Sequence, residues 1–294
     1  LPAWVEANQE RLACDVILVS DTTMLSDKVP SINCGMRGVT YLQVNVKGSD
    51  KDLHSGHYGG AVANPINTLC DMISSLIDKD GRVTIPGFYD DVEELSAEDR
   101  ASLARAPFDM EEYKESIGIK EVKGEKGYTT LERTAIRPCL DVCGIWGGYT
   151  GAGSKTVLPS EAHAKISMRI VPNQKADKII DLAAKHILAI APPYVEVSVE
   201  KMEAGNGFLI PITSPAYKAA SRAMTEVYGI EPVPSRGGGS ICVLADMRNI
   251  LGADPLLMGF GLERDTIHSP NESYLLRQFY AGIESITLFY EYWK

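Results

Sequence analysis

The hydrophobic positions along the chain repeat with two different periods. Residues 15–20 form a short apolar run that ends at Asp21, as in a buried parallel strand, whereas residues 42–46 alternate between apolar and polar side chains. Residues 62–76 carry apolar side chains three and four positions apart, which predicts an amphipathic helix. The first quarter of the chain therefore predicts a buried strand, a half-buried strand and a helix.

The middle of the chain repeats the half-buried pattern. Residues 166–170 and 195–199 alternate like strands with one buried face, and residues 179–190 between them repeat like an amphipathic helix. Three half-buried strands and two helices predict a two-layer α+β domain, a sheet covered on one face. Residues 80–150 carry Gly, Pro and acidic clusters and predict an irregular insertion with short helices, which must bury Trp146 and Tyr149.

The last third returns to α/β character. Ser214 and Pro215 predict the start of a helix, and Gly229 predicts its end. A glycine turn, a helix from about Ser240 and a strand at residues 256–260 follow. The chain closes with a terminal helix whose apolar positions are Leu276, Phe279, Tyr280, Ile283 and Ile286. We therefore predict an α/β domain with a mostly parallel sheet (residues 1–36 and 207–294), interrupted by an inserted α+β lid domain (residues 37–206).

Composition narrows the class of protein. The 294 residues, 45% apolar and 23% charged, fit a globular protein of two domains. A net charge of −10 argues against nucleic acid or an anionic membrane as the main partner. No apolar run approaches the roughly 20 residues that cross a bilayer. Six cysteines without a CxxC pair predict reduced, mostly buried residues of a cytoplasmic protein.

Two loops carry candidate metal ligands. Asp21 follows the first buried strand, and His268 lies on a polar loop after the apolar run at residues 256–260. Open α/β sheets bind ligands at the carboxyl ends of their strands, and imidazole and carboxylate are natural metal ligands there. The alternative for Asp21 is a loop N-cap, and the alternative for His268 is a histidine that binds no metal.

Other candidates lie in the predicted lid and in the glycine run. Arg169 falls on the polar face of its strand, and its planar guanidinium could bind a carboxylate through two hydrogen bonds. The alternative is a solvated surface arginine. His54 and His57 lie in a predicted loop and are candidate functional residues. The alternative is that such a histidine only caps backbone groups of the loop. The backbone amides after Gly237-Gly-Gly239 lie at the predicted helix N-terminus near Ser240 and could bind a ligand. The alternative is a glycine turn with no ligand.

Five motifs, in this order, resemble the M20 metallopeptidase family, and most closely its dipeptidases of the carnosine-dipeptidase type. They are Asp52-Leu-His-Ser-Gly56, Gly151-Ala-Gly-Ser-Lys-Thr-Val-Leu-Pro159, Met168-Arg-Ile-Val-Pro-Asn173, Gly237-Gly-Gly-Ser240 and His268-Ser-Pro-Asn-Glu272. The resemblance covers essentially the whole chain. It implies a phosphorylase/hydrolase-like catalytic domain interrupted by a lid that dimerises.

The resemblance also implies roles for individual residues. Asp21 and His268 would be terminal ligands to two divalent metal ions, zinc with manganese as the alternative. His54 would stabilise the oxyanion in the active site of the neighbouring subunit. The implied substrate-binding residues are Thr156, Arg169, Gly239 and Ser240. His57 fits the backbone-capping alternative better than His54 does, and His163 and His186 match no motif and are expected to be structural.

The implied activity is metal-dependent hydrolysis of dipeptides by a homodimer. The alternatives are an N-acyl-amino-acid amidohydrolase, of the acetylornithine deacetylase or succinyl-diaminopimelate desuccinylase type, and a non-catalytic dimerising module. The insertion at residues 80–150 and the run Lys155–Pro159 favour the dipeptidase. The resemblance also implies a His-x-Asp metal-ligand motif, a bridging aspartate and a Glu-Glu pair upstream of Asp21, which would supply the other metal ligands and the general base. None of these is present in the residues before Asp21. We therefore expect the chain to be the carboxyl-terminal two-thirds of a dipeptidase, unable to hold the two ions or hydrolyse dipeptides alone.

Overall fold

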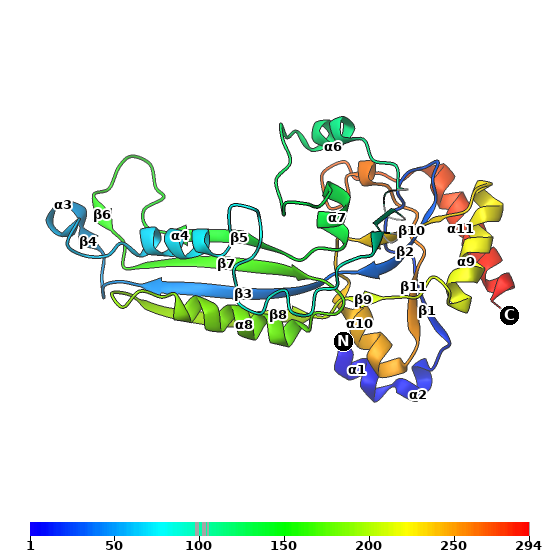
Figure 1. The fold of residues 1–294 in the computed structure, drawn as a ribbon, viewed down its shortest axis with the longest axis horizontal. Helices are drawn as coiled ribbons and strands as arrows, with labels where there is room; N and C mark the ends of the chain where they lie inside the picture. The colour runs from blue at the N-terminus through cyan, green and yellow to red at the C-terminus, as the bar shows by residue number, and fades with distance from the viewer. Residues whose placement is uncertain (98–99, 102–103, 105, 294) are drawn as a thin grey trace.

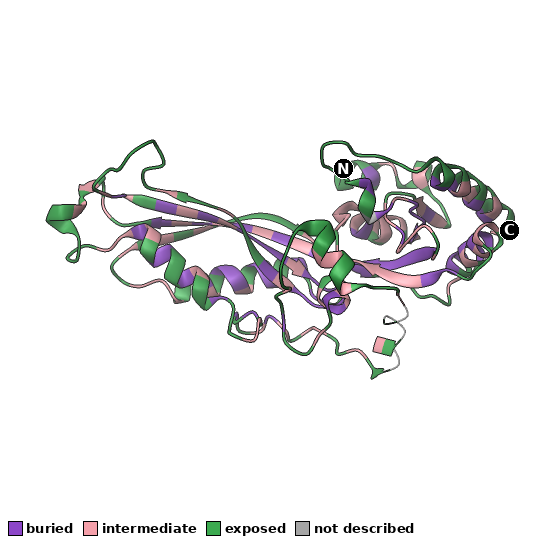
Figure 2. Ribbon diagram, turned by 90° about the horizontal axis from the view of Figure 1, so that it is seen from above, coloured by how far each residue is buried: buried purple, intermediate pink, exposed green. Residues whose placement is uncertain are grey.

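The computed structural model describes residues 1–97, 100–101, 104 and 106–293. Figure 1 shows an elongated molecule, with a long antiparallel sheet at one end and a shorter α/β part at the other. Figure 2 shows that the buried residues follow the strands of both parts, whereas the tip at the far end of the long sheet is exposed. The predicted combination of an α/β part and a two-layer α+β part is confirmed.

The long sheet has four antiparallel strands in the order β5-β7-β3-β8. Two helices, α4 and α8, pack on one face and bury Leu42, Val44 and Ile166 almost completely. We call this sheet with its helices the lid. Its elements are β3 (Gly38–Lys47), α4 (Pro65–Ser75), β5 (Cys139–Gly147), β7 (Glu161–Ile170), α8 (Ala176–Ala189) and β8 (Glu196–Gly205).

The tip of the lid lies beyond the ends of the long strands. Its elements are β4 (Leu53–His54), α3 (Ser55–Tyr58) and β6 (Val157–Leu158), and β4 and β6 pair as a small antiparallel sheet. In Figure 1 this tip is at the opposite end of the molecule from the α/β part.

The α/β part contains a mixed sheet in the order β1-β11-β2-β10, with β9 paired to β2. The pairs β1/β11 and β2/β10 are parallel, whereas β2 runs antiparallel to β11. Helices α9 and α11 cover one face, and α10 lies on the other. The elements are α1 (Pro2–Ala7), α2 (Gln9–Leu12), β1 (Val16–Val19), β2 (Ser31–Met36), β9 (Phe208–Leu209), α9 (Pro215–Tyr228), β10 (Val233–Gly237), α10 (Cys242–Leu251), β11 (Asp254–Leu257), the 3-10 helix η1 (Glu263–Asp265) and α11 (Leu276–Tyr292).

Strand β2 lies in a segment that the sequence analysis did not assign to a strand. All six of its residues are buried, although Ser31, Asn33 and Gly35 are typical of a loop. Asn33 is satisfied because its Oδ1 accepts hydrogen bonds from the amides of Gly35 at 3.1 Å and Gly237 at 3.2 Å. A polar residue with this many partners is compatible with a central strand.

The predicted insertion has different bounds, because β5 begins at Cys139. From here on, the insertion means residues 76–138, which contain α6 (Met110–Ile117) and α7 (Thr130–Ala135). The expected burial of Trp146 and Tyr149 is wrong, since these side chains are 44% and 47% exposed. Trp146 lies on edge strand β5 and stacks on the His163 ring with centroids 5.0 Å apart.

The terminal helix α11 buries a different face from the one predicted. Gln278, Gly282, Ser285 and Phe289 are buried, and α11 packs chiefly against α9. The predicted apolar positions Leu276, Phe279, Tyr280 and Ile283 are at least 50% exposed, and Ile286 is partly buried. Small residues were needed on the packed face because Phe260 leaves no space at Gly282, where a Cβ would lie 3.0 Å from its ring.

The cysteines are free, as predicted, but their predicted burial is wrong for most of them. Cys34 is buried, Cys139 and Cys242 are half-buried, and Cys14, Cys70 and Cys143 are exposed. Among the described residues, no helix combines the length and the apolar character that crossing a membrane requires.

Candidate active site

Arg169 and Ser240 meet where the lid joins the α/β part. Arg169 lies near the end of β7, between the fully buried Met168 and Ile170, so its side chain projects from the face opposite the helices. Its Nη1 donates a hydrogen bond of 2.8 Å to the Oγ of Ser240. No carboxylate in the described part of the chain lies within ion-pair distance of Arg169. Its remaining N–H groups are available to an anionic ligand.

The glycine run leads directly into this contact. Strand β10 ends at Gly237, Ser240 follows three residues later, and α10 begins at Cys242. The N-cap residue, Ile241, makes no side-chain hydrogen bond to the first turn of α10. Free amides and the positive end of the helix dipole therefore lie beside Arg169 and favour a negatively charged group. Gly239 is exposed, and a Cβ there would lie no closer than 3.9 Å to another residue.

A second guanidinium, that of Arg37, lies close enough to Arg169 for the two positive charges to interact. Arg37 is only 8% exposed and connects β2 to β3. Burial lowers the pKa of Arg37, and the nearby positive charge of Arg169 lowers it further. Two cations this close produce a local positive potential. The sequence analysis did not identify Arg37; its only signal was an arginine between Gly35 and Gly38 in an otherwise small and apolar segment.

The site residues of the tip form a separate cluster. His54 is the N-cap of α3, and its Nδ1 accepts a hydrogen bond of 3.0 Å from the amide of Gly56. In the neutral ring the proton is therefore on Nε2, which lies 3.4 Å from the Oγ1 of Thr156. His54 and Thr156 are both exposed, so this N–H can be presented to a ligand. The expectation that His57 suits the capping role better is wrong, because His54 is the cap; the His57 ring lies 4.5 Å from that of His54.

Strand β7 separates the two clusters. Between Glu161 and Arg169 it runs for eight residues, which is about 27 Å at roughly 3.4 Å per residue. His54 pairs with Val157, which precedes β7, and thus lies still further from Arg169. The structure does not bring His54 and Thr156 together with Arg169 and Ser240 within one chain.

Asp21 and His268 are on loops that leave the same edge of the mixed sheet. Asp21 follows β1, His268 follows the neighbouring parallel strand β11, and the two loops begin with a bridge between Thr23 and Gly261. Both side chains are exposed and make no hydrogen bond within the described part of the chain. His268 has a left-handed backbone conformation, with φ of 60°.

These two side chains have the right donor atoms for a divalent ion, but they do not complete a site. Carboxylate and imidazole both suit zinc, and a catalytic zinc usually has three protein ligands. Among the described residues, no group of three or more His, Cys, Asp or Glu is placed to hold a metal ion.

The two other histidines are engaged in the lid. The Nδ1 of His163 lies 2.8 Å from the Oδ1 of Asn45, and its Nε2 lies 3.5 Å from Glu161. His186 is half-buried in the last turn of α8, where an imidazole near the helix C-terminus is favourable. Both environments agree with the structural role expected for these residues.

Comparisons with known proteins agree with this architecture. A family model described as a peptidase dimerisation domain, of the M20 type, matches residues 35–195. The Cys-Gly metallodipeptidase dug1 of Schizosaccharomyces pombe is 32% identical over 95% of this chain and 59% of its own length. The human Beta-Ala-His dipeptidase is 28% identical over 99% of this chain and 58% of its own length.

A solved structure shows the same fold. The M20 family metallo-carboxypeptidase Sso-CP2 from Sulfolobus solfataricus superposes with a TM-score of 0.88 at 31% identity, over 99% of this chain and 66% of that one. The chain thus spans less than two thirds of the length of each of these three relatives.

Proposed function

Because the chain belongs to the M20 peptidase family, we propose that the natural protein is a metal-dependent dipeptidase that acts as a homodimer. Two of the three relatives described above are dipeptidases by name, and the third is a metallo-carboxypeptidase. Both kinds of enzyme act on peptides with a free carboxyl end next to the bond that is cleaved.

The observation that carries this proposal is the anion site around Arg169. An arginine without a carboxylate partner among the described residues donates to Ser240, beside the N-terminus of α10, and its charge interacts with that of the buried Arg37. Such a site suits the terminal carboxylate of a dipeptide, held by the Arg169 fork, the Ser240 hydroxyl and the amides after Gly239.

His54 is proposed to act on the substrate held by the other subunit. The Nε2–H of its neutral ring is exposed beside Thr156 at the tip of the lid. The tip lies beyond the start of β7, whereas Arg169 lies near the end of that strand. Donation from this N–H to the carbonyl oxygen of the scissile bond would stabilise the negative charge that develops there. Because His54 and Arg169 are far apart in one chain, a complete site requires two chains.

Edge strand β5 is the proposed dimer contact. Val142 and Ile145 pair with the buried Ile166 and Ala164 of β7, which places them on the helix-covered face of the lid. They are nevertheless 39% and 50% exposed. A second β5 pairing along this edge would satisfy its free backbone groups and bury this apolar strip. Ile145→Asp should therefore shift sedimentation of the natural protein toward the monomer, and an unchanged dimer would move the contact elsewhere.

Asp21 and His268 are proposed to supply one ligand each to the divalent ions, and the remaining ligands lie outside the described residues. A bound divalent ion would polarise the scissile carbonyl and lower the pKa of the attacking water. Asp21 would contribute its charge from the tip of β1, and His268 would contribute a neutral imidazole from the loop after β11.

A hydrolysis panel tests this proposal. The natural protein, loaded with zinc or manganese, should cleave dipeptides faster than the same dipeptides with an amidated carboxyl end. His54→Ala should lower kcat by roughly 10²- to 10³-fold with unchanged metal content, because an oxyanion donor acts in the transition state. Preferential cleavage of N-acetyl amino acids would identify an N-acyl amidohydrolase instead. No turnover of either class would favour a non-catalytic dimerising module.

A further inference from the structure

Arg37 connects the substrate site to the insertion. Its Nε donates to the carbonyl oxygen of Gly238 at 3.1 Å, within the glycine run. Its Nη1 donates to the carbonyl oxygens of Arg133 at 3.3 Å and Arg137 at 3.1 Å, both in the insertion. In return, the Oγ of Ser240 donates to the carbonyl oxygen of Arg37 at 2.6 Å. The glycine run and the insertion therefore meet at the Arg37 side chain.

The partners of Arg37 make its position sensitive to the backbone around it. Within the described part of the chain, no carboxylate forms an ion pair with this buried guanidinium, which is instead held by carbonyl oxygens. Burial lowers the pKa of Arg37, so the charged form is costly unless these acceptors are in place. Two of the three carbonyl acceptors belong to the insertion, and a shift of its backbone would release the Arg37 side chain.

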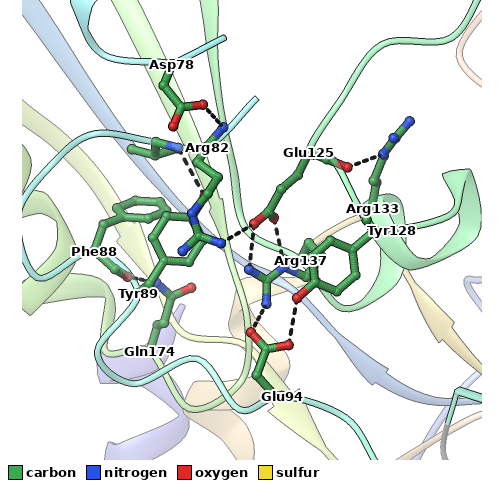
Figure 3. Close-up of polar contacts among 12 residues, drawn as sticks. Asp78, Arg82, Phe88, Tyr89, Glu94, Glu125, Tyr128, Arg133, Arg137 and Gln174 are labelled. Atoms are coloured by element: carbon green, nitrogen blue, oxygen red, sulfur yellow. Dashed lines mark hydrogen bonds and ion pairs between the residues drawn. The ribbon is translucent and has the colours of Figure 1, made fainter. Parts of the chain in front are cut away.

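The insertion is held at this point by a buried ion pair. Arg137 is 2% exposed and forms a bidentate pair with Glu125, with Nε–Oε2 and Nη2–Oε1 distances of 2.8 Å (Figure 3). Its Nη1 also donates to Glu94 at 3.0 Å, and its guanidinium carbon lies 4.2 Å from the centroid of the Tyr128 ring. Burial lowers the pKa of Arg137, but the bonds to Glu125 outweigh this and raise it. The backbone at residue 137 is therefore firmly anchored.

A second contact joins the insertion to the glycine run. Helix α7 packs against β10, and a Cβ at Gly238 would lie only 2.8 Å from the carbonyl oxygen of Thr134. The glycine run is thus pressed against α7 on one side and bonded to Arg37 on the other. Both contacts end at Gly238, two residues before Ser240.

We propose that Arg37 is a positioning residue for Ser240 and Arg169, and that the Glu125–Arg137 pair of the insertion holds Arg37 in place. This inference rests on the proposed function, because it assigns the insertion to the capture of the substrate's carboxylate. If the pair is lost, the carbonyl acceptors of Arg37 shift and Gly238 is released. The released glycine run then carries Ser240 away from its acceptor, the main-chain carbonyl oxygen of Arg37. The Arg169 fork thereby loses the Ser240 hydroxyl that orients it.

The test compares two ion pairs of the insertion in the natural protein. The double variant Glu125→Gln/Arg137→Gln removes both buried charges of the pair, and the partners that it releases, Arg82 and Glu94, have side chains that are 45% and 68% exposed and stay solvated. The matched control is Asp91→Asn, which breaks the 2.7 Å pair between Asp91 and Lys178 of α8. That pair connects the insertion to the lid and makes no contact with Arg37. Arg37→Lys serves as a second test variant, since an ammonium keeps the charge but loses the fork.

Kinetics provide the first readout. For a free dipeptide, the double variant and Arg37→Lys should raise KM about tenfold, the equivalent of one hydrogen bond to a charged group, with little change in kcat. The amidated dipeptide and the Asp91→Asn control should show no such change. In an Arg169→Ala background the double variant should add nothing further, because both changes act through the same contact. Equal effects on acid and amide, or additive effects, would overturn the inference.

Hydrogen exchange provides a readout that does not depend on turnover. Amides of residues 238–242 should exchange faster in the double variant and in Arg37→Lys, and should not change in Asp91→Asn. If the wild-type protein cleaves no dipeptide, the proposed function fails while this measurement still tests the inference. Unchanged exchange at residues 238–242 in both test variants would overturn it.

Discussion

Replacing Arg169 by methionine removes the guanidinium while keeping much of the stem that packs beside β3 and β5. Arg169 pairs in register with Val39 and Cys139, so the strand itself should be unaffected. One N–H is engaged by Ser240, and the others have no protein acceptor in the described part of the chain and are proposed to bind the substrate. A hydrogen bond to a charged group contributes about 1.5–3 kcal/mol, which corresponds to a change of roughly 10- to 150-fold in binding.

We expect this loss in KM and not in kcat. The carboxylate that Arg169 binds is present in both the ground state and the transition state, so its removal weakens both equally. The lower half of the range applies because Ser240, the amides of α10 and the buried charge of Arg37 remain. Arg169→Lys should recover part of the affinity, since it restores the charge without the fork.

Steady-state kinetics with a dipeptide and its amide measure this effect. Wild-type protein should discriminate between the two substrates, and Arg169→Met should lose most of that discrimination. Lys165→Met, on the same strand and the same face, is the matched control and should leave both KM values unchanged. Undiminished preference for the free acid in Arg169→Met would refute the assignment of the carboxylate site.

Two further predictions concern stability. Gly238→Ala should lower the free energy of unfolding by about 1–3 kcal/mol in thermal denaturation, because its Cβ would overlap Thr134, whereas Gly239→Ala should leave it unchanged. Burial raises the pKa of Glu132, but hydrogen bonds, chiefly from Arg100, outweigh this and lower it. Its stabilising contribution is therefore complete above the ordinary Glu pKa of about 4.3 and lost as the pH falls through the lower folded value. Glu132→Gln should flatten the loss of melting temperature on acidification, and an identical acid profile would contradict this.

The alternating strands and amphipathic helices of the lid could be predicted from sequence, because one buried face imposes a simple period. The α/β part was harder. Strand β2 contains Asn33, whose amide oxygen accepts from Gly35 nearby and from Gly237, 204 positions away, and no local pattern indicates the distant partner. The apolar side of α11 suggested burial, but small residues such as Gly282 are what allow the helix to approach Phe260.

The candidate site was predicted only in part for a similar reason. Arg169 could be placed on the open face by strand alternation, and its contact with Ser240 agrees with that placement. Arg37 was missed because its role depends on carbonyl oxygens in the distant insertion, and a backbone acceptor leaves no mark in the sequence. The roles of Asp21 and His268 stay predictions.

The central claim is that one active site is built from two chains, with His54 from one subunit and Arg169 from the other. Mixing His54→Ala and Arg169→Ala proteins after dissociation and reassociation tests it directly. In a mixed dimer, one of the two sites would contain both wild-type residues. With random pairing, half of the dimers are mixed, so the rate at a substrate concentration well below KM should return to about one quarter of the wild-type value. If both residues acted within the same chain, every site would lack one of them, and the mixture would show only the mean of the low rates of the separate variants.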